Sequence, residues 1–529
     1  MSWPQITHLS TAVASHFDPY FSMWRLAWIA HALGNSPLGL FDANVFYPAP
    51  RTLAMSDATM LQGLVAAPLL WADLSPVVVY NLLLLGGMAG SGLAMFVLAR
   101  SVTGSNGPAF VAAAIFTMGP YRIEHFMHLE LQWAMWMPLA LWAMHQAIDR
   151  GSWRFGLLVG LFLWLQILSS VYYGMFLAIA LAVFAPAMLF RRSAAQVTRS
   201  AGVLLLGAVS AAVLTAPYAI PYLKNAQALG NRPVTEMLTY SARPISYLAS
   251  PPQNWLWGWT ADWGGPELHL FPGAIAVVLA IAAAWHPSRR VVVAYALVAI
   301  AGIELSFGPH GMLYGWLLDN VSVLHGLRSP SRFGIVVLCA IALLAALGTQ
   351  VVQQRFARRS PRQAFAFAAS VLAMLSVEYA NTGMTLALVA PDPPINRNVY
   401  ATLRSLGPGV VLELPQPRPD RLPGYDPWYA YWSHSHWYPL VNGYSGYYPS
   451  EYGETLEHTA RFPDRHSIGY LRHLGVRYVL VHREHFEDDE EFMELVMEMS
   501  NRPEMRRFGK FQAPHGDVEL FLLTARTDP

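Results

Sequence analysis

The N-terminal part of the sequence carries three aspartates among aromatic and apolar residues. Asp18 stands before Pro19 and an amphipathic aromatic run over 20–33, and Asp42 and Asp57 follow further along. A carboxylate held where a helix emerges at a membrane surface can accept a proton from a hydroxyl. Because Asp–Pro is also common in the first turn of a helix, the alternative is that Asp18 caps the following helix. Asp18 is therefore the candidate base, and Asp42 and Asp57 are candidates for contacting a substrate.

A second polar group lies in the short segment 119–133, GPYRIEHFMHLELQW, between two apolar stretches. It contains Arg122, Glu124, His125 and His128. Charged side chains at membrane depth are costly and tend to be functional. His125 and His128 are three residues apart, so they can share a helix face and, with a carboxylate, bind a divalent metal ion. The alternative is a hydrated loop that caps two helices.

Two arginines, Arg328 and Arg332, lie in the sequence HGLRSPSRFG directly before an apolar stretch. A guanidinium group suits two phosphate oxygens at once, so these residues are candidate phosphate ligands. The alternative is that both side chains reach from the apolar region to the polar interface. The sequence contains no Walker A motif, no GxGxxG fingerprint in a βαβ setting and no nucleophile elbow. This speaks against ATP-driven transport by the chain alone.

The composition indicates which solvent surrounds these groups. Only 13% of the 529 residues are charged, 54% are hydrophobic, and the mean hydropathy is +0.32. Water-soluble domains carry about a quarter charged residues, so much of this chain must lie in lipid. The formal net charge of +1 gives no field that would attract nucleic acid. The single cysteine, Cys339, cannot form an internal disulfide.

Membrane-spanning helices are expected in the middle of the chain, because a helix needs about 20 apolar residues to cross a bilayer. About 10 candidate spans are found, roughly at 76–100, 106–120, 131–149, 154–169, 172–190, 200–221, 268–285, 290–306, 332–351 and 363–389. The apolar segment 59–72 is too short to cross, and we expect it to form an interfacial helix.

Arginine placement predicts the sidedness of these spans. Short loops on one side carry Arg100, Arg150, Arg154, Arg191, Arg192, Arg199, Arg289, Arg290, Arg355, Arg358, Arg359 and Arg362. Short loops rich in arginine stay in the cytoplasm. We therefore expect the opposite, extracytoplasmic side to carry the segments 1–75, 121–130, 222–267, 307–331 and 390–529.

The composition changes near residue 391, where charge rises and long apolar runs stop. Short β-rich runs at 410–414, 476–482 and 518–524 and an acidic amphipathic stretch at 487–499 predict a small α/β domain. The expected fold is mainly α: a polytopic transmembrane helical bundle with a small extracytoplasmic C-terminal α/β domain. The expected domains are 1–75 (the first external loop with interfacial helices), 76–390 (the transmembrane domain) and 391–529 (the α/β domain).

Four features in this order resemble the GT-C superfamily of integral membrane glycosyltransferases, and within it bacterial proteins related to the YfhO-type branch. Asp18 opens a long first external loop, and the interfacial segment 59–72 follows it. The next spans carry the pattern YNLLLL…LAMFVLARSVTGS…AAAIFTMGPYRIEH. The motif LRSPSRFG then precedes a late span.

The resemblance implies an inverting transfer of a sugar from a polyprenyl-phosphate donor to an extracytoplasmic acceptor at the bacterial inner membrane. Asp18 matches the family's acidic residue in the first external loop, which serves as a base or a metal ligand. Glu124 stands where a second acidic residue often lies. Arg122, Arg328 and Arg332 are then candidates for holding the departing phosphate.

Two alternatives of other classes stay open. A non-enzymatic membrane protein, such as a lipid-linked-sugar transporter or an assembly scaffold, predicts polar residues near span midpoints, where only Gln166 and Glu378 stand out. Members of the superfamily also have a transmembrane helix before the Asp-bearing loop, and residues 1–17 contain none. An inactive, truncated family member is therefore the third hypothesis. The expected partners are the lipid bilayer and the lipid-linked donor, and no protein partner is indicated.

Overall fold

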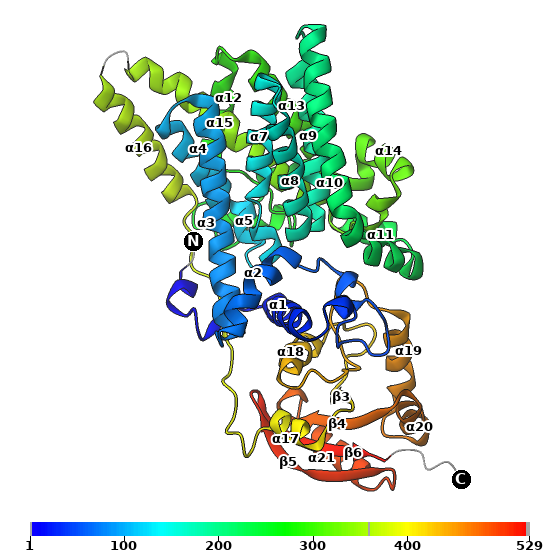
Figure 1. Ribbon diagram of the computed structural model, residues 1–529. Coiled ribbons are helices and arrows are strands. Elements are labelled where there is room, and N and C mark those ends of the chain that lie inside the picture. Colours follow the sequence, from blue (N-terminus) through cyan, green and yellow to red (C-terminus); the bar gives the residue numbers. More distant parts are fainter. Residues whose placement is uncertain (1–2, 358–359, 525–529) are drawn as a thin grey trace. The chain divides into compact units, whose positions relative to one another are not determined.

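The protein is described by a computed structural model that covers residues 3–357 and 360–524 (Figure 1). The chain divides into two compact units. The first, which we call the helical unit, comprises the N-terminal residues up to Thr7, then Leu82–Ile220 and Gly230–Thr385. The second, the mixed unit, comprises His8–Asn81, Pro221–Leu229 and the chain from Leu386 onward. Each unit is described by itself.

The helical unit contains the long apolar helices, and a helix is present in each of the ten predicted spans. The bounds are α3 (Pro76–Thr103), α4 (Asn106–Met118), α5 (Pro120–Glu124), α6 (Leu129–Gln132), α7 (Trp136–Arg150), α8 (Trp153–Ser169), α9 (Val171–Leu189), α10 (Ala194–Leu229), α11 (Val234–Thr239), α12 (Ala274–Ala282), α13 (Arg289–Ser306), α14 (Met312–Asn320), α15 (Gly334–Ala357) and α16 (Pro361–Glu378). The first residues of α3 and the last of α10 belong to the mixed unit.

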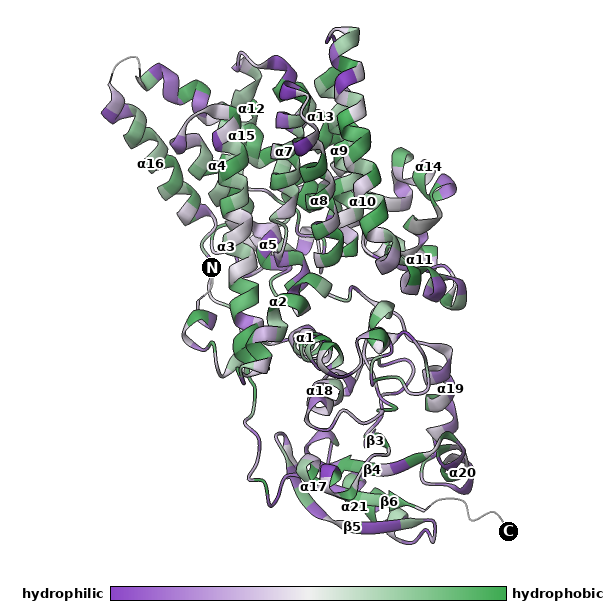
Figure 2. Cartoon of the chain, viewed as in Figure 1, coloured by the Kyte–Doolittle hydropathy of each residue, from purple (hydrophilic) through white to green (hydrophobic). Residues whose placement is uncertain are grey.

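Four helical segments of the described chain are long and apolar enough to cross a membrane: Pro76–Thr103, Val171–Leu189, Ala194–Leu229 and Pro330–Phe356. Three shorter apolar helices accompany them, at Met60–Trp71, Trp153–Ser169 and Ala274–Trp285. Figure 2 shows hydrophobic residues along most of the long helices and hydrophilic residues around α5. The predicted mainly helical membrane architecture with a small C-terminal sheet is confirmed.

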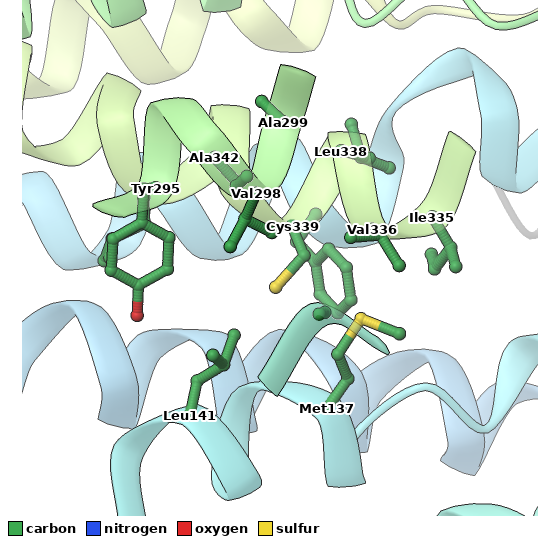
Figure 3. Packing of buried hydrophobic residues seen from close by; sticks show 14 of the residues in the cluster. Met137, Leu141, Tyr295, Val298, Ala299, Ile335, Val336, Leu338, Cys339 and Ala342 are labelled. Atoms are coloured by element: carbon green, nitrogen blue, oxygen red, sulfur yellow. The ribbon is translucent and has the colours of Figure 1, made fainter. Parts of the chain in front are cut away.

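The core of the helical unit forms around α15, which packs against α4, α12 and α13. Figure 3 shows Tyr295 and Val298 of α13 and Cys339 of α15 facing Met137 and Leu141 of α7. Cys339 is 1% exposed, so its thiol is a packing group. Close packing here needs small residues, as in other membrane helix bundles.

Helix α12 approaches α15 closely at a glycine. A Cβ built on Gly348 of α15 would lie 1.8 Å from the carbonyl oxygen of Leu279 in α12. That distance is far below van der Waals contact, so only glycine permits this approach.

The mixed unit contains a four-stranded sheet in the order β3-β4-β6-β5. Its strands are β3 (Val410–Leu414), β4 (Val476–His482), β5 (Met505–Ala513) and β6 (Gly516–Leu523). β3 and β4 are parallel, and the other two pairs are antiparallel. A parallel pair needs a crossover connection, and the chain between β3 and β4 contains α18 (Asp426–Trp432), α19 (Ser450–Thr459) and α20 (Arg465–Leu474). Two further helices, α17 (Val399–Leu406) and α21 (Asp489–Ser500), complete this part of the chain.

The strand predictions agree closely with the structure. Two predicted strands, 410–414 and 476–482, have the observed bounds of β3 and β4, and 518–524 falls on β6. The acidic run begins α21, where Asp488 caps the helix by accepting a hydrogen bond from the Glu491 N–H. Strand β5 was not predicted, because the charged residues of MRRFGKFQA obscure the pattern of a strand. Charge on an edge strand also discourages pairing with other chains.

The N-terminal segment is folded into the mixed unit with the C-terminal residues. Strand β1 (Ala12–Ala14) pairs antiparallel with β2 (Leu386–Leu388). Helix α1 (Asp18–Asn35) packs against both α2 (Met60–Trp71) and α18. This packing buries α1 on almost every side over its first thirteen residues.

Candidate functional site

Arg122 cross-links the polar segment between α4 and α7 through hydrogen bonds to its backbone. Its Nη1 donates to the carbonyl oxygen of Leu131 at 2.8 Å, and its Nη2 donates to that of Gln132 at 2.9 Å. The side chain is fully buried. Both terminal nitrogens therefore bond the loop's own backbone, and this geometry supports a structural role for Arg122 rather than the expected phosphate contact.

Glu124 binds two groups of the segment that leads into α12. Its Oε1 accepts a hydrogen bond from the Glu267 backbone N–H at 2.7 Å, and its Oε2 lies 2.7 Å from Nδ1 of His269. The other ring nitrogen of His269, Nε2, lies 3.1 Å from the carbonyl oxygen of Ala261. Both partners of the imidazole are acceptors, so the ring fits best when both nitrogens carry a proton.

The charge state of His269 follows from these contacts. His269 precedes the first residue of α12, Ala274, and so lies before the helix. Burial alone lowers the pKa of His269, but the hydrogen bond and charge of Glu124 and the Ala261 carbonyl outweigh it, and the net pKa is raised above 6.5. The contacts therefore favour the protonated, imidazolium form of His269 beside Glu124.

We expect this pair to make the unfolding midpoint pH-dependent. Because the folded pKa of His269 is raised, its stabilisation is present below pH 6.5 and is lost as pH rises through the folded pKa. The midpoint of the detergent-solubilised wild type should therefore fall more steeply with rising pH than that of His269→Gln. His310→Gln, at an exposed histidine of the same unit, is the control. Parallel pH curves for wild type and His269→Gln would contradict the charged pair.

Glu267 holds two arginines. Its carboxylate makes a two-pronged ion pair with Arg332, at 2.9 Å from Nε and 2.6 Å from Nη2, and Nη2 of Arg328 lies 3.8 Å away. Burial raises the pKa of the Glu267 carboxyl. The charge and hydrogen bonds of Arg332 lower it by more, so the net pKa lies well below its usual value. Glu267 follows Gly265, whose φ is +102°, and itself has a φ of +64°. The tight turn Gly265–Leu268, closed by a hydrogen bond from the Leu268 N–H to the Gly265 carbonyl, thus brings the carboxylate to the arginines.

The two arginines differ in how much of each is available to a ligand. The side chain of Arg332 is 8% exposed, whereas that of Arg328 is 33% exposed. The Arg328 guanidinium lies 5.0 Å from the Tyr240 ring centre, and the Arg328 backbone N–H donates to the Tyr172 hydroxyl at 2.8 Å. Arg332 is thus neutralised by Glu267, while Arg328 is held in place with part of its side chain exposed.

His125 and His128 lie near this charge cluster without forming a metal site. His125 is 1% exposed, neither ring nitrogen has a hydrogen-bond partner, and burial holds its pKa well below 6.5. Nδ1 of His128 is 4.0 Å from the Glu130 carboxylate. Within the described ranges, no three His, Cys, Asp or Glu side chains are grouped so as to hold a metal ion. The predicted metal site at His125 and His128 therefore lacks a third ligand among the described residues.

Asp18 is placed at the start of α1 by the mixed unit. The capping residue of α1 is Phe17, and no side chain caps this end, so the alternative that Asp18 is an N-cap is wrong. Its Oδ1 accepts a hydrogen bond from the Tyr444 hydroxyl at 2.9 Å. Nδ1 of His16 lies 3.2 Å from both the Asp18 backbone N and its Oδ2. As the first helical residue, Asp18 also benefits from the positive end of the helix dipole.

The other two N-terminal aspartates take part in local structure. Oδ1 of Asp42 accepts a hydrogen bond from the backbone N–H of Arg51 at 2.8 Å, where Arg51 has a φ of +54°. The backbone carbonyl of Asp57 accepts a hydrogen bond from the buried guanidinium of Arg25. Both contacts shape the segment between α1 and α2, and the substrate roles of Asp42 and Asp57 remain predictions.

A buried polar network joins β3 to β4 in the mixed unit. Oε2 of Glu413 lies 2.6 Å from Nε2 of His482, and both side chains are almost fully buried. Asp426 is also fully buried and accepts hydrogen bonds from Tyr452 and from Nδ2 of Asn442. Burial raises the pKa of Asp426 more than those hydrogen bonds lower it, and the net pKa is about 7.

Glu267 and His269 were not among the predicted site residues. They stand in the stretch GGPELHLFPG, where a glycine pair and a proline mark a turn and a carboxylate and an imidazole interrupt an apolar region. A polar residue before an apolar span is a signal in itself. The predicted span 268–285 hid it, since the observed helix begins at Ala274.

No protein-family model matches the chain, and no curated protein matches its sequence. Two solved structures of ArnT from Cupriavidus metallidurans are similar to it, one in the apo state at 13% identity and one bound to undecaprenyl phosphate at 15% identity. Each comparison covers 97% of this chain and 95% of that chain, with a TM-score of 0.49. A likeness this distant leaves the chemistry to be argued from the residues themselves.

Proposed function

We propose that the chain is a membrane glycosyltransferase that moves a sugar from a polyprenyl-phosphate donor to an acceptor hydroxyl, with inversion at the anomeric carbon. One observation carries the proposal: the guanidinium of Arg328, whose side chain is 33% exposed, is fixed beside a neutralised Glu267–Arg332 pair, directly before an apolar segment long enough to cross a membrane. Such a group suits a phosphate borne on a lipid. The membrane helices supply the setting in which such a donor resides.

Arg328 would act on the phosphate as it leaves. Breaking the bond between the sugar and the phosphate leaves the electron pair, and thus a growing negative charge, on the phosphate oxygen. A preorganised cation stabilises that charge more in the transition state than in the ground state. Glu267 already neutralises Arg332, so Arg328 is the cation whose charge is less compensated in this cluster.

Asp18 would act on the acceptor as the general base. The hydroxyl proton passes to the Asp18 carboxylate while the hydroxyl oxygen forms the new bond to the anomeric carbon. Arg328 belongs to the helical unit and Asp18 to the mixed unit, and the contacts that position each of them lie within its own unit. The arginine alternation supports an extracytoplasmic location for the loops that carry both groups. Glu124, which binds Glu267 and His269, would act as a positioning residue.

The donor role of Arg328 is tested by binding. We expect Arg328→Ala to weaken binding of a polyprenyl-phosphate analogue to the purified protein by about 10-fold or more, and Arg328→Lys to restore only part of it. The reason is that a guanidinium makes two bonds to a phosphate where an ammonium is a point charge. Arg154→Ala, at an exposed arginine of the same unit, is the matched control.

The neutral polyprenol and free inorganic phosphate complete that experiment. The polyprenol should bind wild type and Arg328→Ala equally, because it has no phosphate to lose contact with. Equal affinity of both proteins for the phosphorylated lipid would reject the phosphate role and leave Arg328 as an interfacial side chain. A transporter or scaffold would share the phosphate contact but would not depend on Asp18.

A further inference from the structure

The segment Leu440–Tyr447 is bonded along its length to the loop between α1 and α2. The Leu440 N–H donates to the Asn44 carbonyl at 2.7 Å, and the Phe46 N–H donates to the Asn442 carbonyl at 3.1 Å. The Tyr447 N–H donates to the Met55 carbonyl at 3.1 Å. Two stretches almost 400 residues apart in the sequence therefore form one ladder within the mixed unit. The C-terminal residues are part of the framework around α1.

The residues directly before Tyr444 are also bonded to the buried network of Glu413 and Asp426. The Asn442 side chain accepts from the Glu413 N–H at 2.8 Å and donates to the Glu413 carbonyl and to Asp426, both at 3.0 Å. At Gly443 a Cβ would lie 2.7 Å from the Phe46 ring, so no larger residue fits without displacement. The backbone entering Tyr444 is thus fixed on two sides.

The Tyr444 ring has little freedom. It meets the rings of Phe17 and Phe21 edge to face, with ring centres 5.2 Å and 5.0 Å apart. These are favoured geometries for aromatic pairs. From this position its hydroxyl donates to Oδ1 of Asp18 at 2.9 Å.

We propose that Tyr444 is a positioning residue that orients the Asp18 carboxylate for proton transfer, and that the segment Asn442–Tyr444 is built to hold it there. This inference rests on the proposed role of Asp18 as the base. A hydrogen bond to one carboxylate oxygen fixes the rotation of the group and favours its ionised form. A general base must be both ionised and aligned with the hydroxyl that it deprotonates.

Tyr444→Phe tests the proposal, because it removes the hydroxyl and keeps the packed ring. We expect kcat to fall about 10-fold, as a hydrogen bond of this size implies. We also expect the acidic limb of the kcat–pH profile to move to higher pH, while KM for the donor stays unchanged. Tyr438→Phe is the control: Tyr438 lies two residues before Leu440, contacts His436 through its ring, and its substitution should leave all three measurements as in the wild type.

A double-mutant cycle with Asp18→Asn separates positioning from general damage. Tyr444→Phe should cause no further loss of kcat in the Asp18→Asn background, because a positioning residue acts only through the group that it orients. An undiminished further loss, or an acidic limb that does not move, would overturn the proposal.

The four proteins of a second cycle, in which Asp18→Ala removes the acceptor oxygens of Asp18, report on the contact without any turnover. Their unfolding midpoints should be non-additive if the hydroxyl and the carboxylate interact. A wild type without transferase activity but with this coupling would defeat the proposed function and leave the positioning contact standing. Additive midpoints would show that Tyr444 does not act on Asp18, whatever the activity of the chain.

Discussion

Asp18→Asn is expected to lower the turnover of sugar transfer by about 10²–10⁴-fold, because it removes the proton acceptor. Folding should be almost unaffected. Phe17 and not Asp18 is the capping residue of α1, and an asparagine oxygen can still accept the Tyr444 hydrogen bond. The lost charge at the first turn of the helix contributes only about 0.3–1 kcal/mol. Turnover and unfolding midpoint should therefore separate clearly.

The measurement compares transfer rate and unfolding midpoint in the same preparations. Asp73→Asn is the matched control, since Asp73 is exposed and has a φ of +61°, which asparagine tolerates. Binding of the polyprenyl-phosphate analogue should be the same in Asp18→Asn as in the wild type. A folded Asp18→Asn protein with normal turnover would remove Asp18 from the site and make Asp42 or Asp57 the next candidates.

Glu267→Ala is expected to lower the free energy of unfolding by about 3–5 kcal/mol. The substitution leaves the Arg332 guanidinium, which is 8% exposed, without its two-pronged partner. Removing one member of a buried ion pair costs this much because an uncompensated charge remains buried. The backbone N–H of Glu267 still reaches Glu124, so the loss reports on the carboxylate.

Thermal unfolding in detergent, followed at several pH values, tests this. Because the folded pKa of Glu267 is depressed, its stabilisation is present above the ordinary carboxyl pKa and is lost as pH falls through the folded pKa. Wild type should therefore lose its advantage over Glu267→Ala at acidic pH. Arg328→Ala leaves the Glu267–Arg332 pair intact and should cost far less. A Glu267→Ala midpoint equal to that of Arg328→Ala would show that the pair adds no stability.

The double variant Glu267→Ala with Arg332→Met separates the cost of an unpaired buried charge from the cost of lost packing around the pair. Replacing both partners of a buried pair by apolar groups is often neutral. The double variant should therefore recover much of the stability that Glu267→Ala loses. A double variant as unstable as Glu267→Ala would attribute the loss to packing around the turn rather than to an unpaired charge.

Features that depend on close neighbours along the chain follow from the amino-acid sequence by itself. The apolar runs predicted a helix in each of ten segments, and short β-rich runs placed β3 and β4 with their observed bounds. Asp–Pro marked the first turn of α1 at Asp18. Each of these depends on backbone preference and on transfer of side chains out of water, which act over a few residues.

The choice of partner for each polar side chain came only from the tertiary structure. Arg122 binds its own loop, Arg332 is committed to Glu267 across 65 residues, and Tyr444 reaches Asp18 across 426. The sequence offered three equivalent arginines, and packing left only Arg328 partly open. From hydropathy and residue spacing one can infer that a charged group in a poorly hydrated region needs a partner. The packing of segments that are distant in the sequence decides which partner the group binds. Short-range sequence patterns do not predict that packing.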